Sequence, residues 1–362
     1  MTEITTMQVR KANLDELGVS TTHSPEDLSG KILVRIERFG MTANNITYGV
    51  VGDRIGYWKF FPTEDTTFGV IPVWGIGVVE ASGLPEIAVG ERLYGYWPMG
   101  SHAVLEPGRI DQSRFFDASE HRKELAAVYN RYLRLSNDPQ DDPATDDMRM
   151  VLWPLYATSF CLYDFALAGE WYGAEQVLIV SASSKTGIGT GYAFQADPDT
   201  PKIVGMTSTG NKAKVDALDL YDQVLTYDQI EAELENVPTL IIDMSGSGPV
   251  ISRLHQHLGD NMRFTSHVGL THYSEAGMGD GYIRERSEMF FAPGHIAKRN
   301  ADWGPGEFER RSGDFWSQAM RKSTDWLTIN HAQGLAQAQS AYREVLGGGT
   351  PADQAWTISL IE

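Results

Sequence analysis

The pattern of apolar and polar positions divides the chain into regions of different character. The stretches KILVRIERFG, FGVIPVWGIGVVEASG and GERLYGYWPMGSHAVLEP, within residues 31–110, are rich in β-branched and aromatic residues and indicate strands separated by turns. Residues 111–150 are charged; EHRKELAAVYNRYLRL predicts partly helical structure, and the acidic SNDPQDDPATDD predicts a solvated insertion. From Val151, VLWPLYATSFCLYDFALAGEW is apolar on nearly every side, which predicts a buried helix.

Short apolar strands then alternate with helices. Strands are expected over Val177–Val180, Lys202–Met206, Thr239–Met244 and Arg263–Leu270, with helices through Phe194, from Asn211 to about Leu220, and after Pro249. Short, continuously apolar strands in such an alternation are typical of a parallel sheet covered by helices, so the fold class is α/β. The last part, residues 329–360, predicts a helix stopped by three glycines and a final strand.

Composition narrows the range of partners. A chain of 362 residues suggests two domains of ordinary size, and a net charge of −18 argues against a nucleic acid or an anionic membrane as partner. The N-terminus lacks the apolar core of a signal peptide, and no apolar run reaches membrane-spanning length. The single Cys161 excludes an intramolecular disulfide and a cysteine-cluster zinc site. We therefore expect a cytoplasmic protein that acts on a small molecule.

The turn SASSKTGIG, residues 181–189, contains two competing motifs. Ser184-Lys185-Thr186 looks like the end of a nucleoside-triphosphate P-loop, which needs glycine directly before the lysine and again five residues earlier. Those two positions hold Ser184 and Ile179, so the P-loop interpretation fails.

The alternative is a dinucleotide-binding turn. A strand ends, small residues turn the chain, and a helix begins whose N–H groups can face a pyrophosphate. Gly187 would permit close backbone approach, and Gly189 close packing of the helix on the sheet. The residues expected at the cofactor are Ser184, Lys185, Thr186, Gly187 and Ile188.

The second strand indicates which dinucleotide binds. NAD-binding units usually carry an acid about 20 residues beyond the glycines, on the ribose hydroxyl. Here the strand ends in TSTGNKAK, without an acid. Ser208 and Thr209 could donate hydroxyls and Lys212 a positive charge to a 2′-phosphate, which favours NADPH. An ordinary helix cap at Thr209 or Asn211, followed by surface lysines, is the competing interpretation.

The order of these parts resembles the medium-chain dehydrogenase/reductase superfamily, in a divergent subgroup of its zinc-free quinone oxidoreductase branch. The segment GVIPVWGIGVVEASGLPEIAVGERLYGYWPMGSHAVLEP, the helix LYATSFCLYDFAL, the turn SKTGIG, the strand LIIDMSGSG and the late helix NHAQGLAQAQSAYREVLGGG carry the resemblance. It implies a GroES-like substrate domain at 1–155, with the acidic insertion 111–150. A doubly wound Rossmann NADPH-binding domain at 156–305 and a C-terminal return at 306–362 would follow.

The resemblance also assigns residues. Thr158 takes the position of the superfamily's threonine, and Ser245 and His267 join the cofactor set. The zinc enzymes of the superfamily carry a Cys and a Gly-His-Glu segment in the first domain, whereas GMTANNITYG and FGVIPVWGIG here contain neither. We therefore expect no metal.

Without a metal, hydroxyl or amide donors must polarise the carbonyl, or a phenol must deliver the proton. In the relatives this role falls on the segment matching GMTANNITYG, which here offers Asn45 and Tyr48, with Tyr57 on a loop expected to face the same cleft. Packing is the competing role for these tyrosines. The aromatic residues nearby suit a planar or apolar substrate.

The expected function is zinc-independent, NADPH-dependent reduction of a quinone, an enone or another activated alkene or carbonyl. A short-chain dehydrogenase is disfavoured because no Tyr-x-x-x-Lys occurs. A non-catalytic NADPH-binding sensor of the same fold stays open. The apolar SEMFFAP, Ser287–Pro293, is expected to be an edge strand that pairs across a homodimer, unless residues 294–312 cover it.

Overall fold

A computed structural model describes residues 1–138, 141–268 and 277–361. The chain forms two compact units. Unit 1 comprises Met1–Val151 and Thr328–Glu362, and unit 2 comprises Leu152–Leu327. The sequence-based boundaries assigned 306–362 to the return, whereas the return begins at Thr328. Residues before it belong to unit 2 because α9 (Glu307–Ser323) packs on α4 (Lys185–Gln195) and α8 (Ala292–Trp303).

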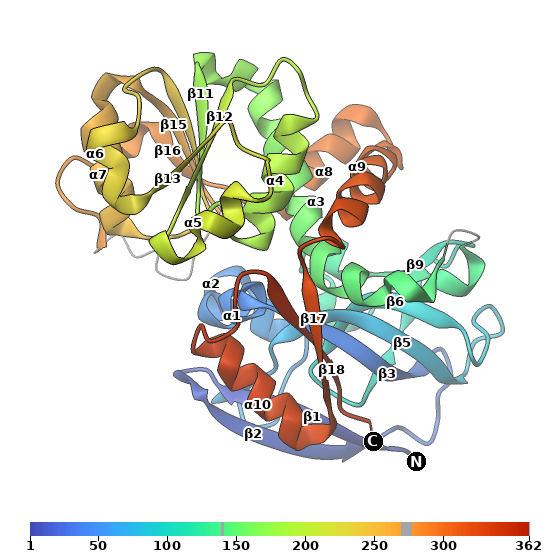
Figure 1. The fold of residues 1–362 in the computed structure, drawn as a ribbon. Coiled ribbons are helices and arrows are strands. Elements are labelled where there is room, and N and C mark those ends of the chain that lie inside the picture. The colour runs from blue at the N-terminus through green and yellow to red at the C-terminus, as the bar shows by residue number, and fades with distance from the viewer. Residues whose placement is uncertain (139–140, 269–276, 362) are drawn as a thin grey trace. The chain divides into compact units, whose positions relative to one another are not determined.

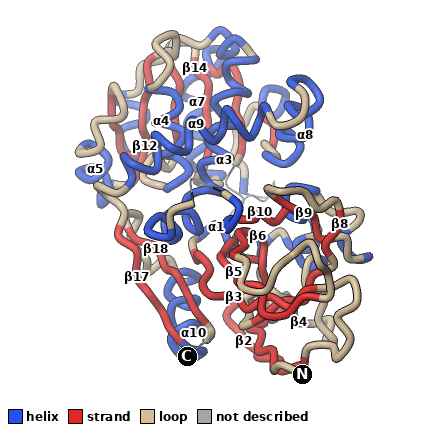
Figure 2. Tube along the Cα trace, turned by 90° about the vertical axis from the view of Figure 1, so that its right-hand side faces the viewer, coloured by secondary structure: helices blue, strands red, loops and turns tan. Residues whose placement is uncertain are grey.

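Unit 1 is built mainly from β-strands. Its largest sheet has the order β17-β18-β3-β5-β6-β10-β9-β8, with β7 also paired to β3, and a smaller sheet has the order β2-β1-β4. The C-terminal return adds β18 antiparallel to β3, and α10 lies against β17 and β18 (Figure 2). The elements are β1 (Glu3–Arg10), β2 (Asn13–His23), β3 (Ile32–Met41), α1 (Ala43–Val50), α2 (Gly52–Ile55), β4 (Phe68–Gly69), β5 (Pro72–Ser82), β6 (Arg92–Pro98), β7 (His102–Leu105), β8 (Pro107–Gly108), β9 (Arg114–Asp117), β10 (Arg131–Arg134), β17 (Thr328–Gln333), α10 (Gly334–Leu346) and β18 (Gln354–Ser359).

Unit 2 is a parallel sheet between two layers of helices, as predicted (Figure 1). Its strand order is β13-β12-β11-β14-β15-β16, so the direction of winding reverses between β11 and β14. Alternate strand residues face opposite layers: Leu178 packs with the α6 and α7 side, and Val177 with the α3, α4 and α5 side. The remaining elements are α3 (Asp146–Ala168), β11 (Gln176–Val180), β12 (Lys202–Thr207), α5 (Thr209–Asp216), β13 (Gln223–Thr226), α6 (Ile230–Glu233), β14 (Thr239–Asp243), α7 (Gly248–Leu258), β15 (Met262–His267) and β16 (Ser287–Met289).

The expected strands and helices therefore exist, with small shifts at their ends. β13 was missed because Gln223–Thr226 is short and follows a polar segment. The fourth strand ends at His267, and positions 269–270 of its expected range lie outside the described residues. The predicted fold class, α/β with a β-rich domain and a doubly wound parallel-sheet domain, is confirmed.

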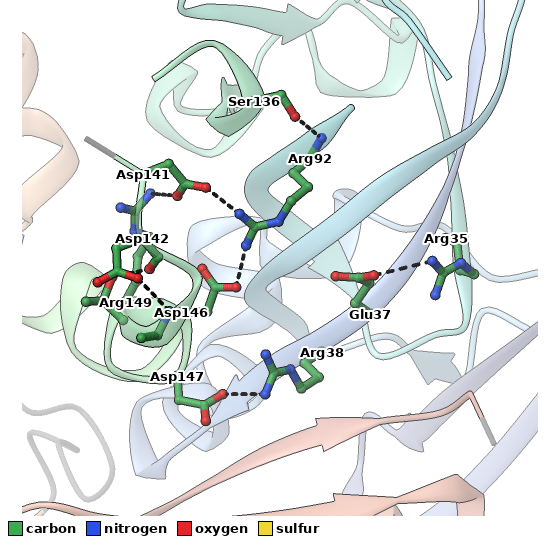
Figure 3. Close-up of polar contacts among 12 residues, drawn as sticks. Arg35, Glu37, Arg38, Arg92, Ser136, Asp141, Asp142, Asp146, Asp147 and Arg149 are labelled. Atoms are coloured by element: carbon green, nitrogen blue, oxygen red, sulfur yellow. Dashed lines mark hydrogen bonds and ion pairs between the residues drawn. The ribbon is translucent and has the colours of Figure 1, made fainter. Parts of the chain in front are cut away.

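The prediction for residues 111–150 holds in part. Residues 136–138 and 142–144 of the acidic stretch are exposed, as expected, whereas EHRKELAAVYNRYLRL does not form a long helix. Outside residues 146–150, which begin α3, the described part of this segment is helical only in short 3₁₀ turns, and β9 and β10 extend the large sheet instead. The guanidinium of Arg92 on β6 pairs with both Asp141 and Asp146, whose side chains are 9% and 4% exposed (Figure 3). Burial raises the pKa of Asp146 against the opposing effect of Arg92. These buried ion pairs attach the C-terminal end of the insertion to β6.

The apolar helix α3 passes a length-and-composition test for membrane spans. Residues 143–168 have a mean hydropathy of 1.3 in the most apolar window, and 61% of that window is buried within the protein. The core helix of a soluble protein has this character, and Cys161 on α3 is fully buried, which raises the pKa of its thiol.

Candidate functional site

The turn between β11 and α4 has the form of an anion-binding helix start. Ser184 caps α4, its Oγ accepting from the Gly187 N–H at 3.1 Å. A Cβ on Gly187 would lie 2.8 Å from the Ser181 carbonyl oxygen and 2.9 Å from Ser184 Oγ, so only glycine fits. The atoms that approach Gly187 most closely therefore belong to the turn itself. The first N–H groups of α4 consequently lie at the carboxyl edge of the sheet, where a helix N-terminus favours phosphate.

Gly189 allows a different contact from the one expected. A Cβ there would lie 2.5 Å from the Tyr156 ring and 2.6 Å from Ser159 Oγ, so at Gly189 the close contact of α4 is with α3 rather than with the sheet. Ser159, which sequence analysis missed, donates its hydroxyl to the Thr186 carbonyl at 2.9 Å. The neighbouring Thr158 donates to the Pro154 carbonyl within α3 at 3.1 Å. α3 therefore helps to fix the first turn of α4, in which Ile188 is buried.

The end of β12 carries no carboxylate. Thr207 is buried there and donates to Ser183 Oγ at 3.0 Å. Ser208 and Thr209 are exposed at the start of α5. One turn later, Lys212 Nζ lies 2.9 Å from the Asp216 carboxylate. A 2′-phosphate would thus meet hydroxyls and a lysine, but it would compete with Asp216 for that lysine.

A buried carboxylate organises the next two strand ends. Asp243 Oδ1 accepts from Ser245 N at 2.8 Å and from Ser245 Oγ at 2.7 Å, and Asp243 Oδ2 lies 3.1 Å from His267 Nδ1. His267 Nε2 lies 3.0 Å from Tyr282 Oη. Asp243 and His267 are fully buried. Ser245 and His267, both expected at the cofactor, therefore have hydrogen bonds that shape the turn itself.

The predicted cofactor residues other than Thr158, which lies on α3, are brought together at one edge of unit 2. Four neighbouring parallel strands, β12, β11, β14 and β15, have their carboxyl ends at this edge. The groups around Thr209, Gly187 and Ser245 follow the first three strands, and His267 ends the fourth. The reversal between β11 and β14 is the place where sheets of this type bind ligands. A pyrophosphate at α4 and a 2′-phosphate near α5 fit these residues.

The predicted catalytic residues lie in unit 1. Asn45 forms a capping box with Thr42, accepting from Thr42 N at 2.9 Å, and its amide donates to the Pro72 carbonyl at 3.2 Å. Asn45 is thereby committed to holding α1. Tyr48, one turn further, is 6% exposed, and its ring centroid lies 4.5 Å from that of Tyr57.

Tyr48 and Tyr57 belong to a larger aromatic cluster. Burial raises the pKa of Tyr48, while Trp74 and Asn44 act to lower it. Burial raises the pKa of Tyr57 as well. Both phenols are therefore protonated at neutral pH and available as donors. The cluster comprises Tyr48, Tyr57, Phe60, Trp74, Tyr94, Tyr96 and Tyr129.

Tyr129 was missed because it lies in the stretch EHRKELAAVYNRYLRL, whose pattern indicated a partly helical surface segment rather than a contribution to the core. Among residues 1–138, 141–268 and 277–361, no three His, Cys, Asp or Glu side chains are grouped to hold a metal ion. The absence of a metal stays a prediction.

Comparison with known proteins places the chain. A family model described as "Protein of unknown function (DUF2855)" matches residues 39–351. The chain belongs to this family. No curated protein matches this DUF2855 chain in sequence.

Solved structures resemble the DUF2855 chain over its whole length. CurA from Vibrio vulnificus in complex with NADPH has a TM-score of 0.64 at 13% identity, covering 100% of both chains. The quinone oxidoreductase from Coxiella burnetii has a TM-score of 0.57 at 13% identity, covering 99% of both chains. A putative NADPH:quinone reductase from Bacillus thuringiensis has a TM-score of 0.59 at 13% identity, again covering 99% of both. These likenesses show that the chain shares the two-unit α/β fold of these proteins, which is the fold that its resemblance to the medium-chain dehydrogenase/reductase superfamily implies.

Proposed function

We propose that the protein is a zinc-independent oxidoreductase that uses NADPH to reduce a quinone, an enone or another activated alkene or carbonyl. The observation that carries the proposal is the carboxyl edge of unit 2, where the start of α4 meets a β12 end without a carboxylate. The NADPH in the CurA complex supports the choice of nucleotide. When bound, NADPH supplies a hydride to a carbon of the acceptor.

Residues of unit 2 would bind the nucleotide. The N–H groups of Lys185 and Thr186 would meet the pyrophosphate, and Gly187 and Ser184 keep that helix start open. Ser208, Thr209 and Lys212 would meet the 2′-phosphate. Ser245 and His267 would act through the turn that they hold with Asp243.

Residues of unit 1 would stabilise the negative charge that develops on the acceptor oxygen. As the hydride reaches carbon, an electron pair moves to the acceptor oxygen, and that oxygen needs donors and a proton. Tyr48 would donate a hydrogen bond to it, with Asn45 holding α1 so that the phenol is positioned. Tyr57 would be the second phenol at the oxygen. The aromatic cluster favours a flat, ring-bearing acceptor.

The competing proposal is a non-catalytic protein that binds NADPH as a sensor. The buried donors of the aromatic cluster favour catalysis, because a sensor does not need protonated phenols in its other unit. We further propose that the protein works in the cytoplasm and needs no metal.

Binding and turnover separate these possibilities. Calorimetry with NADPH, followed by its oxidation in the presence of 9,10-phenanthrenequinone or 4-phenyl-3-buten-2-one, should show binding and then consumption dependent on the acceptor. NADPH binding without consumption with either acceptor would favour the sensor. No binding would reject both.

A further inference from the structure

The insertion contributes a ring to the aromatic cluster of unit 1. Tyr129 lies in the short 3₁₀ turn Ala127–Asn130 and is 8% exposed. Its ring centroid lies 4.7 Å from that of Tyr96, 5.4 Å from Phe60 and 5.6 Å from Tyr57. Trp74 and Tyr48 are also within 6.5 Å of it. Tyr129 therefore touches five of the six other members of the cluster.

The insertion does not depend on the Tyr129 hydroxyl for its position. Arg122, 1% exposed, pairs with Asp117 at 3.2 Å and donates to Tyr132 Oη at 3.1 Å. Tyr132 Oη in turn donates to the Tyr96 carbonyl at 2.6 Å. The Asn130 amide donates to the Arg122 carbonyl at 3.0 Å. These buried bonds lie on both sides of Tyr129 and hold the segment.

The hydroxyl of Tyr129 lies 2.9 Å from that of Tyr57. Either phenol can donate in the resting protein. Once Tyr57 loses its proton, Tyr57 can only accept, and Tyr129 must be the donor. A hydrogen bond to the charged form of a group favours that form, and such a bond is stronger than one between neutral partners.

We propose that Tyr129 is a positioning residue of the reductase site: its hydroxyl orients Tyr57 and stabilises the phenolate that Tyr57 becomes on protonating the reduced acceptor. This inference rests on the function proposed above. In the step, the O–H bond of Tyr57 breaks and an O–H bond forms on the acceptor oxygen, which has received the electron pair. Water returns the proton to Tyr57 before the next turnover.

A double-mutant cycle tests the inference. Turnover of 9,10-phenanthrenequinone is measured for wild type, Tyr57→Phe, Tyr129→Phe and the double variant, each of which keeps both rings. The matched control is Tyr342→Phe, which removes another buried hydroxyl of unit 1, bonded to the Leu14 carbonyl at 2.9 Å. Thermal midpoints and NADPH affinities are recorded for every variant.

We expect Tyr129→Phe to lower kcat about tenfold, the value of a hydrogen bond to a charged group, with KM and NADPH affinity within about twofold of wild type. The solvent isotope effect on kcat should rise, because proton transfer becomes slower. Adding Tyr129→Phe to Tyr57→Phe should cost nothing further, since Tyr129 acts through Tyr57. Tyr342→Phe should keep the wild-type kcat and isotope effect.

Three results would overturn the inference. Additive losses in the double variant would show that Tyr129 does not act through Tyr57. Wild-type turnover in Tyr57→Phe or Tyr129→Phe would remove the proton step while leaving the reductase function intact. Absence of turnover in wild type, with NADPH bound, would reject the reductase function itself and this inference with it.

Discussion

At the scale of single residues, three side chains proposed to serve the cofactor also form hydrogen bonds that shape the turns of unit 2. Ser184 was expected at a phosphate and is also the cap of α4. Ser245 and His267 were expected to touch the cofactor, yet both are bonded to Asp243. A residue type and its distance from a strand end can be read from a sequence. The partner that takes its hydrogen bond depends on tertiary neighbours far away in the chain.

Lys212 tests the choice of NADPH over NADH. Lys212→Ala should weaken NADPH binding roughly tenfold or more and leave NADH binding unchanged, because only the 2′-phosphate forms a charge-assisted bond with this ammonium. Lys214→Ala, which removes the same charge two residues on, is the matched control. Calorimetry with both nucleotides gives the four affinities. Equal losses for NADPH and NADH, or none, would contradict the 2′-phosphate assignment.

Tyr48 tests the oxyanion contact. Tyr48→Phe keeps the ring in the aromatic cluster and removes only the donor, so turnover should fall about 100-fold or more. NADPH affinity should be unchanged, because Tyr48 lies in unit 1 and the residues proposed to bind the nucleotide belong to unit 2. Steady-state kinetics with 9,10-phenanthrenequinone measures the effect. Turnover within a few-fold of wild type would assign the contact to another group.

At the scale of elements, the alternation of strands and helices was readable and the insertion was not. Val177–Val180 and its parallel neighbours are apolar throughout, which is the direct consequence of burial on both faces. In 111–150 some of the charges are paired inside the protein, as Asp146 is with Arg92 and Asp117 with Arg122. Burial of paired charges cannot be recognised without knowing that both partners are there.

The contact between α3 and α4 depends on Gly189. Gly189→Ala would drive a methyl group into the Tyr156 ring, and such overpacking costs about 1–3 kcal/mol of stability. Gly210→Ala on α5, where a Cβ meets nothing within 4 Å, should instead be neutral or stabilising by up to about 1 kcal/mol. Urea unfolding followed by tryptophan fluorescence compares the two. Equal stability of both variants would show that α3 and α4 are not in close contact.

The packing of α7 on β15 predicts a pH dependence. His255 Nδ1 accepts from the Ile283 N–H at 2.9 Å and Nε2 lies 2.9 Å from Thr265 Oγ1, so the ring is neutral. Burial lowers the pKa of His255 from 6.5 to about 3. The unfolded chain therefore takes up a proton below about pH 6.5 that the folded protein refuses. Stability should fall by up to about 1.4 kcal/mol per pH unit as pH drops through this window.

His255→Gln removes that titration. The decrease in thermal midpoint between about pH 7 and about pH 5 should be smaller in this variant than in wild type. His257→Gln, two residues along α7 and partly exposed, should keep the wild-type decrease. An unchanged decrease in His255→Gln would mean that the buried ring is not the proton-binding group.

At the scale of the whole molecule, the sheet edge predicts assembly. β16 is the last strand of the parallel sheet, and Phe291 beyond it is 41% exposed, whereas the ring centroid of Phe290 lies 5.6 Å from that of His295 on α8. Part of the apolar segment is thus covered by its own chain, as the competing interpretation held. We still expect a homodimer that pairs through this edge. Light scattering at micromolar concentration should give twice the mass of 40.1 kDa, and a monomeric mass would remove the dimer.

The central claim is hydride transfer from NADPH to carbon, and deuterium labelling tests it most directly. Purified protein is incubated with NADPH deuterated at the transferable position and with 4-phenyl-3-buten-2-one, and the product is analysed by mass spectrometry. We predict that one deuterium from NADPH is found on a single carbon of the reduced product. When unlabelled NADPH is used in deuterated water, that carbon should carry no deuterium. No product, or a product without the label from NADPH, would contradict the assignment of this protein as an NADPH-dependent reductase.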